Sequence, residues 1–344
     1  MGKLKLRERM ASLLDRTGAL EAVLQLRRRS PVSTVSVVTF HRVAEIGEGE
    51  PYDPDVVDAT PAQFRRRVET LARIGTPIGM DALIRALDGG ALPPNPVMIT
   101  FDDGYRSCRD VALPFLRELG VPATFFIATG FAPGGRLYWW EQIAAALDLA
   151  GRRVGDLTYP RPLRIDTRDP GARRLLDDTV KNTRGLDLER FLGELRTALD
   201  VPWSPALEAH LAAQLIMSWD DIRALRDAGM DIESHTRTHR VLETLDRDEL
   251  REELAGSRRD LEAALGRPVR AIAYPVGRLP PAWIRREVAE AGYRIGLTNA
   301  SGVNHVWPAV AQALDPFDIR RLSTERSQSD AMFLTQIAVP PLAY

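Results

Sequence analysis

The chain has 344 residues, of which 44% are hydrophobic and 27% charged, with a formal net charge of −1. This composition is typical of a globular protein with enough apolar material for a sizeable core, and it excludes a mostly disordered chain. Because the overall charge is close to zero, we expect no nucleic acid partner. Cys108 is the only cysteine, so no disulfide can form within the chain.

The first 30 residues are predicted to form a basic amphipathic helix. Its apolar residues, which oppose arginines, are Leu13, Leu14, Leu20, Val23 and Leu24. Two interpretations stay open: the helix lies on anionic lipid, or it packs its leucines against the rest of the protein. The uninterrupted apolar run of a secretory signal is missing, and no stretch approaches the roughly 20 apolar residues of a transmembrane helix. We therefore expect a cytoplasmic protein, or one peripheral on the cytoplasmic face of a membrane.

Strands and helices alternate from residue 34 onward. Short β-branched or aromatic runs predict strands at residues 34–41, 97–101, 123–128, 230–234, 269–274 and 293–298. Amphipathic patterns between them predict helices at residues 61–74, 110–119, 219–228, 247–265 and 281–291. Such alternation is typical of an α/β fold, in which a parallel sheet is covered by helices and closed or nearly closed into a barrel. Residues from about 138 to 217 break the rhythm, and their arginines and leucines at helical spacing predict a mostly helical insertion.

The segment VMITFDDGY, residues 97–105, carries two adjacent carboxylates at the end of a predicted strand. Adjacent residues that leave a strand point in different directions, so one of Asp102 and Asp103 can bind a metal ion while the other accepts a proton from water. Gly104 permits the tight turn that this requires. The same letters also mark ordinary turns and helix N-caps, so the motif alone does not decide between these interpretations.

The segment DIESHTRTHRVL, residues 231–242, has His235 and His239 four residues apart behind another predicted strand. This spacing brings both imidazoles to one face of a helical turn, with two surface histidines as the alternative. Two neutral histidines and one carboxylate form a common catalytic metal site. We therefore expect a divalent ion here, with zinc favoured and cobalt, iron or manganese also compatible.

Two further predicted strands end in polar groups that can take part in catalysis. The segment RAIAYPVGR, residues 270–278, ends in a turn that can aim backbone N–H groups inward, and His41 ends the strand TVSVVTFH. In a parallel barrel the carboxyl ends of all strands meet at one rim, where active sites form. Four strands therefore present reactive groups to the same rim, which predicts an enzyme active site.

These motifs resemble the polysaccharide deacetylases of the NodB homology domain, carbohydrate esterase family four. TFDDGY and SHTRTH carry the resemblance, which extends over residues 34–325 in scattered motifs. It implies a distorted (β/α) barrel of the NodB type, with residues 31–344 as the catalytic domain. It also implies that Asp102 is the catalytic base. The metal ligands that it implies are Asp103, His235 and His239.

The sequence departs from the family pattern at two places. Val276 precedes Gly277 in the third motif, where the family commonly has arginine, proline and tyrosine before its glycine. No C-terminal leucine and histidine motif supplies the usual catalytic acid, because His305 lies in the polar stretch SGVNHVWP. TFHRV resembles instead the arrangement in deacetylases of biofilm polymers of N-acetylglucosamine, which makes His41 the expected acid and His305 the alternative.

The other residues expected around the substrate or the oxyanion are Tyr105, Tyr274, Val276 and Arg321. Arg321 is expected to orient the base by an ion pair, as a similar arginine does in relatives, with a solvated arginine as the alternative. The resemblance implies removal of the N-acetyl group from an amino sugar in a polysaccharide, oligosaccharide or lipid-linked glycan, as in exopolysaccharide biosynthesis. Two alternatives stay open: hydrolysis of another amide, such as a formamide or cyclic ureide, and a catalytically silent carbohydrate-binding protein.

Overall fold

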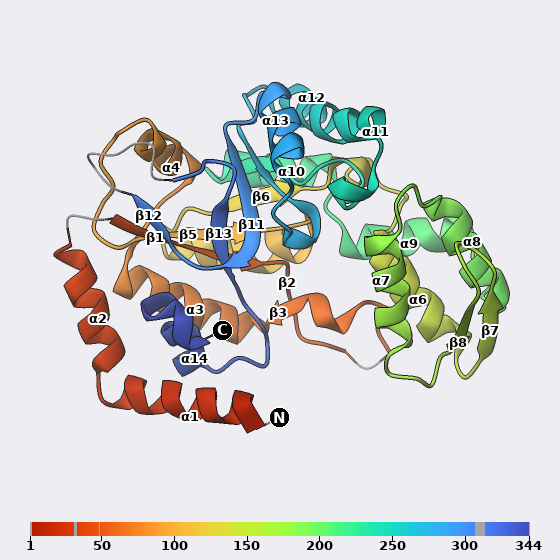
Figure 1. Cartoon of the computed structure of the whole chain (residues 1–344), viewed down its shortest axis with the longest axis horizontal. Coiled ribbons are helices and arrows are strands. Elements are labelled where there is room, and N and C mark those ends of the chain that lie inside the picture. Colours follow the sequence, from red (N-terminus) through yellow and green to blue (C-terminus); the bar gives the residue numbers. More distant parts are fainter. Residues whose placement is uncertain (1, 31–32, 48, 307–313, 344) are drawn as a thin grey trace.

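The computed structural model describes residues 2–30, 33–47, 49–306 and 314–343. Seven parallel strands form a closed barrel, paired in the order β1, β13, β11, β10, β9, β6, β5 and back to β1 (Figure 1). Their bounds are β1 (Ser33–Phe40), β5 (Pro96–Phe101), β6 (Thr124–Ile127), β9 (Asp231–Ser234), β10 (Ala271–Ala273), β11 (Ile295–Ser301) and β13 (Ile319–Ser323). The predicted α/β barrel is confirmed.

Strand β13 is the one barrel strand that the sequence does not predict. Ile319 and Arg321, at alternate positions, are fully buried, whereas Arg320 between them is exposed. An arginine at a buried position conceals the alternation by which a strand is recognised. Shorter strands pair at the margins of the barrel and are β2 (Arg42–Val43), β3 (Val57–Ala59), β4 (Thr76–Pro77) and β12 (Asn304–Val306).

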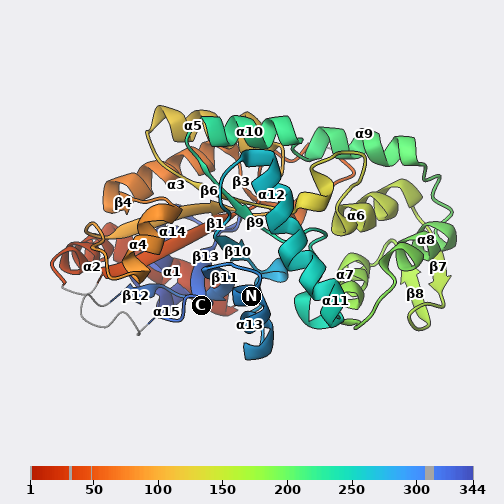
Figure 2. The same ribbon diagram turned by 90° about the horizontal axis from the view of Figure 1, so that it is seen from above.

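Helices surround the barrel (Figures 1 and 2). They are α3 (Pro61–Ile74), α4 (Met80–Leu87), α5 (Leu113–Glu118), α10 (Trp219–Asp227), α11 (Arg247–Arg251), α12 (Ser257–Leu265), α13 (Ala282–Glu290), α14 (Asp330–Ala338) and α15 (Pro340–Ala343). Thr60 and Ser218 begin α3 and α10 with complete capping boxes, in which the cap side chain and the side chain three residues later each accept from the other residue's backbone N–H.

The barrel strands are apolar on both faces because side chains fill the inside and helices cover the outside. One buried cluster, which includes Val37, Met98 and Phe126, fills the barrel. On the other face, Phe64 of α3 packs edge-on against Phe40 with ring centroids 5.1 Å apart. The strands are thereby fixed in register, and their carboxyl ends meet at one rim.

The segment expected as a helical insertion forms a lobe beside the barrel (Figures 1 and 2). Its helices are α6 (Trp139–Ala150), α7 (Ala172–Asn182), α8 (Leu188–Ala198) and α9 (Pro205–Leu215). It also contains an antiparallel pair that the sequence does not predict, β7 (Val154–Leu157) and β8 (Leu163–Asp166). The segment is thus mostly helical, with one short hairpin.

The N-terminal segment forms two helices instead of the single helix expected. α1 (Gly2–Arg16) and α2 (Ala19–Arg28) are separated at Gly18, whose φ of 72° is left-handed and ends the first helix. Leu20 and Leu24 of α2 are buried in the main core. Among the described helices, none combines the length and apolar character that a membrane span requires.

Candidate active site

Strand β5 ends in the two adjacent aspartates. The N–H of Asp102 donates to the carbonyl of Phe40 at 2.9 Å, which continues the pairing of β5 with β1. Asp103 then adopts a left-handed conformation with φ of 73°, and Gly104 follows with φ of 104°. This turn sends the two carboxylates toward different partners. Asp102 faces an arginine, whereas Asp103 faces two histidines.

His235 and His239 follow β9, but the helical turn expected between them is not formed. Thr236 and His239 instead have left-handed φ values of 64° and 55°, and this irregular loop brings the two ring centroids to 4.7 Å. Nδ1 of His235 donates to the carbonyl of Ala273 at 2.8 Å, which leaves Nε2 to face Asp103. Strained backbone of this kind is typical of functional sites.

Asp103, His235 and His239 form a cluster that fits a divalent metal ion. Their candidate ligand atoms all lie within 4.8 Å of one another, and Nε2 of each histidine is 3.3 or 3.4 Å from Oδ1 of Asp103. This Oδ1 is buried and has no hydrogen-bond partner among the described residues, a deficiency that a cation would correct. Burial lowers the pKa of His239 to about 3, so its imidazole is neutral, as a metal ligand must be.

Asp102 forms a buried ion pair with Arg321 of β13. Nη1 and Nη2 of Arg321 donate to Oδ1 and Oδ2 of Asp102 at 2.8 and 2.7 Å, while Nε donates to the carbonyl of Thr298 at 3.1 Å. Burial opposes ionisation of Asp102, but Arg321 and His235 outweigh it and hold the pKa of this carboxyl well below its usual range. The carboxylate is therefore ionised and fixed in orientation.

His41 faces Asp102 from the end of β1. Its Nε2 lies 3.9 Å from Oδ2 of Asp102, and its Nδ1 lies 2.9 Å from Oδ2 of Asp58. The backbone N–H of His41 donates to the same oxygen of Asp58 at 2.5 Å. Burial opposes the charged imidazolium, but the carboxylates of Asp58, Asp103 and Asp102 outweigh it and raise the pKa of His41 to about 10. His41 therefore carries a proton at neutral pH, with Nδ1 held by Asp58.

The two aspartates of the motif and the three histidines line one cavity of about 200 Å³, whereas Arg321 and Asp58 lie behind its wall. Val276 lines it from the turn after β10 and has φ of 61°, a conformation that β-branched residues rarely adopt. The indole of Trp140 packs against the ring of His239 with centroids 4.5 Å apart. The residues that helices α6 and α7 add to the cavity wall are Trp139, Trp140, Asp177 and Lys181. The inserted segment and the barrel therefore shape the cavity together.

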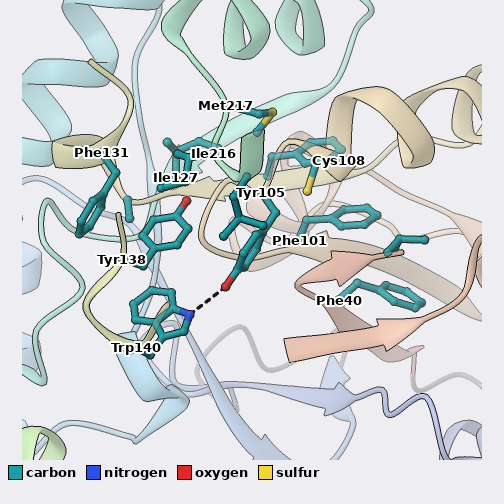
Figure 3. Packing of buried hydrophobic residues seen from close by; sticks show 14 of the residues in the cluster. Phe40, Phe101, Tyr105, Cys108, Ile127, Phe131, Tyr138, Trp140, Ile216 and Met217 are labelled. Carbon is teal, nitrogen blue, oxygen red and sulfur yellow. Dashed lines mark hydrogen bonds between the residues drawn. The ribbon is translucent and has the colours of Figure 1, made fainter. Parts of the chain in front are cut away.

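The two tyrosines expected near the substrate do not line this cavity. Tyr105 is fully buried, and its hydroxyl donates to Oε1 of Glu141 at 2.8 Å. It also accepts from Nε1 of Trp140 at 2.8 Å (Figure 3). The hydroxyl of Tyr274 donates to the carbonyl of Phe317 at 3.1 Å. Both tyrosines thus support neighbouring structure, because their hydroxyls are engaged away from the cavity.

His305, the alternative acid, also lies away from the cavity. Its Nδ1 is 3.2 Å from Oγ1 of Thr34 at the beginning of β1, whereas His41 follows the other end of that strand. Seven residues of extended chain separate these two ends by about 23 Å. His305 is therefore too far from Asp102 to act in the same cavity.

A sequence profile of the polysaccharide deacetylase family matches residues 89–184 and 203–296, together more than half of the chain. The chain belongs to this family. Its members are hydrolases that act on the carbon–nitrogen bond of N-acetylated sugars. None of the curated proteins compared matches the sequence of this deacetylase.

The polysaccharide deacetylase shares its fold with several solved structures. Deacetylase PplD of Streptococcus pyogenes, in complex with acetate, has 17% identity and a TM-score of 0.57 over 89% of this chain and 99% of that chain. IcaB from Ammonifex degensii has 17% identity and a TM-score of 0.54 over 91% of this chain and 98% of that chain. A de-N-acetylase from Aggregatibacter actinomycetemcomitans has 14% identity and a TM-score of 0.54 over 89% of this chain and 100% of that chain. At these identities the likeness is evidence of a common fold.

Sequence reasoning missed several groups of this candidate site. Asp58, which holds His41, lies in the segment DVVDAT, where an aspartate carries no sign of a partner. Asp177 and Lys181 are ordinary residues of an amphipathic helix until the fold brings α7 to the cavity. The adjacent Trp139 and Trp140 offered the one usable signal, since paired tryptophans at the start of an insertion are unusual.

Proposed function

We propose that this polysaccharide deacetylase is metal-dependent and removes the N-acetyl group from an N-acetylated amino sugar in a glycan, with release of acetate. One observation carries the proposal. Asp102, fixed by Arg321, lies between a buried cluster of carboxylate and imidazoles and the protonated His41, all around one cavity. These groups can supply the base, the metal ligands and the acid for metal-assisted hydrolysis of an amide.

The proposed metal ligands are Asp103, His235 and His239. A divalent ion bound by them supplies a Lewis acid for the acetyl carbonyl and lowers the pKa of the attacking water. Two imidazoles and one carboxylate suit zinc best, and cobalt, iron and manganese are compatible with the same donors.

Asp102 and His41 divide the proton transfers between them. Asp102 accepts a proton from the attacking water as the water oxygen bonds to the acetyl carbon, while Arg321 keeps the carboxylate in place. The backbone N–H of Val276 donates to the developing oxyanion. His41 then gives the proton on Nε2 to the sugar nitrogen as the carbon–nitrogen bond breaks. Acetate and the free amino sugar leave, and Asp58 holds His41 ready for reprotonation.

The cavity walls favour a sugar substrate. Trp139 and Trp140 give the cavity an apolar wall for one side of a sugar ring, and Asp177 and Lys181 offer hydrogen-bonding groups for its hydroxyls. At about 200 Å³ the cavity is smaller than the roughly 300–1,000 Å³ that encloses a drug-sized ligand. It therefore suits the acetylated sugar itself, with the rest of a glycan outside.

Acetate release from a panel of N-acetylated mono- and oligosaccharides, with and without a chelator, tests the proposal. We expect release that stops on chelation and that falls by at least about 10³-fold in Asp102→Asn. The matched control is Asp148→Asn, at an exposed position away from the cavity. Full activity of folded, metal-loaded Asp102→Asn would refute the assignment of the base. Formate release from a formamide, in place of acetate release, would favour the alternative hydrolase.

A further inference from the structure

The N-terminal helices expose an unusual share of apolar side chains. Large hydrophobic residues are exposed at nine positions among the described side chains, and four of the nine belong to α1 and α2. They are Leu6, Met10, Leu13 and Leu26, exposed by 60%, 43%, 63% and 68%. Because the first three recur at intervals of four and three residues, they form one stripe along α1.

This stripe faces away from the protein. Ala11, on the opposite side of α1, is buried, and Glu8 accepts a hydrogen bond from Oγ of Ser329 at 2.5 Å. α2 is anchored more firmly still, since Nη1 and Nη2 of Arg27 donate to the carbonyls of Ile337 and Thr34 at 2.6 and 3.1 Å. The two helices are thus attached to the barrel, and the outer side of α1 is left uncovered.

Positive charge borders the stripe. Residues 1–30 contain eight lysines and arginines against three aspartates and glutamates, a formal charge of +5 in a chain whose total is −1. Arg9 is a surface neighbour of Leu6 and Leu13, and Arg16 is a neighbour of Leu13. Both arginines are exposed, and neither forms an ion pair with a described carboxylate. An exposed apolar stripe bordered by cations is complementary to a surface with an anionic outer layer and an apolar layer beneath it.

We propose that α1 docks on an anionic lipid surface. The helix lies in the plane of that surface, with Leu6, Met10 and Leu13 at the boundary of the acyl chains and Arg9 and Arg16 against the headgroup phosphates. Charge decides between this occupant and a second copy of the chain, because a symmetric dimer would bring two segments of charge +5 together. Nucleic acid gives no role to the apolar stripe.

Flotation of the full chain with lipid vesicles tests the docking. We expect binding to vesicles of equimolar phosphatidylglycerol and phosphatidylcholine, weaker binding at high salt, and little binding to phosphatidylcholine alone. Combined Arg9→Gln and Arg16→Gln should weaken binding about 30-fold. Combined Leu6→Gln, Met10→Gln and Leu13→Gln should weaken it at least about tenfold, and Leu13→Gln alone supplies a milder variant should the triple one unfold.

Matched controls make the same kinds of substitution outside the N-terminal helices. Leu149→Gln removes an exposed apolar side chain from α6, and combined Arg152→Gln and Arg161→Gln removes two exposed charges from the inserted lobe. These controls should bind vesicles like the parent. All α1 variants should release acetate from a soluble substrate at the parent rate, so failure of docking is separable from failure of the proposed function. The proposal is overturned by equal binding to both vesicle types, by unchanged binding of the α1 variants, or by a lipid-free dimer that Leu13→Gln dissociates.

Discussion

Arg321 and Asp102 are 219 residues apart in the sequence and meet in a bidentate ion pair from which solvent is excluded. They belong to β13 and to the end of β5, the two strands that flank β1 where the barrel closes. The pair therefore depends on closure of the barrel. Each charge is buried, so each needs the other to compensate its lost hydration.

Arg321→Lys should separate orientation of the base from its charge. Lysine keeps the positive charge but cannot make two parallel N–H bonds to one carboxylate. If Asp102 is the base, loss of its fixed orientation should lower kcat about 10²-fold and leave KM nearly unchanged. Steady-state acetate release measures both constants. Arg320→Lys, at the exposed neighbouring position, should keep both parent values, and an unchanged kcat in Arg321→Lys would contradict a positioning role.

Asp58→Asn should move the pH dependence of the reaction. Asp58 raises the pKa of His41, which reaches about 10, and His41 must be protonated to act as the acid. Asparagine retains an acceptor for the two N–H groups of His41 but removes the negative charge. The pKa of His41 should fall, so the alkaline limb of kcat/KM should shift to lower pH. A pH profile of acetate release measures this, and an alkaline limb that stays in place would exclude His41 as the acid.

The fold was largely predictable because six barrel strands are apolar runs that alternate with amphipathic helices. The exception, β13, is instructive. Its buried positions include Arg321, whose charge is paired with Asp102, and that partner becomes adjacent only when the barrel closes. Sequence periodicity predicts burial from hydrophobicity, so it does not detect a strand with a buried charge.

The location of the candidate site was predictable where its residues follow strands. Asp102, Asp103 and His235 come directly after predicted strands, and His239 lies four residues beyond His235, so topology brings them toward one rim. The expected helical turn between the histidines was wrong, since Thr236 and His239 adopt left-handed conformations, which the spacing of the two histidines does not indicate. The cavity wall from α6 and α7 could not be foreseen, because amphipathic patterns do not tell where an inserted lobe packs.

His239→Ala and His305→Ala should give opposite results although both remove one imidazole. His239 belongs to the cluster of candidate metal ligands, so its loss should reduce bound metal well below one ion per chain and abolish acetate release. His305 belongs to β12 and lies beside the beginning of β1, whereas the cavity is at the end of β1. Its loss should therefore leave bound metal and acetate release at the parent level. Metal analysis of purified protein and an acetate assay decide the outcome. An inactive, metal-loaded His305→Ala would return the role of the acid to His305.

Glu141→Gln should flatten the dependence of stability on pH. Burial raises the pKa of Glu141 to about 8, against 4.5 for a free glutamate, and its oxygens accept bonds from the N–H of Asp53 and the hydroxyl of Tyr105. The folded state thus holds a proton that the unfolded chain releases. The stability this contributes is fully present below pH 4.5 and is lost as the pH rises through about 8. Across that window Glu141 lowers the free energy of unfolding by up to about 1.4 kcal/mol per pH unit.

Urea unfolding at a series of pH values should show a shallower decline of the free energy of unfolding with pH in Glu141→Gln. Glu290→Gln, at an exposed position, should keep the parent slope, and an equal slope in Glu141→Gln would mean that Glu141 is already ionised in the folded protein.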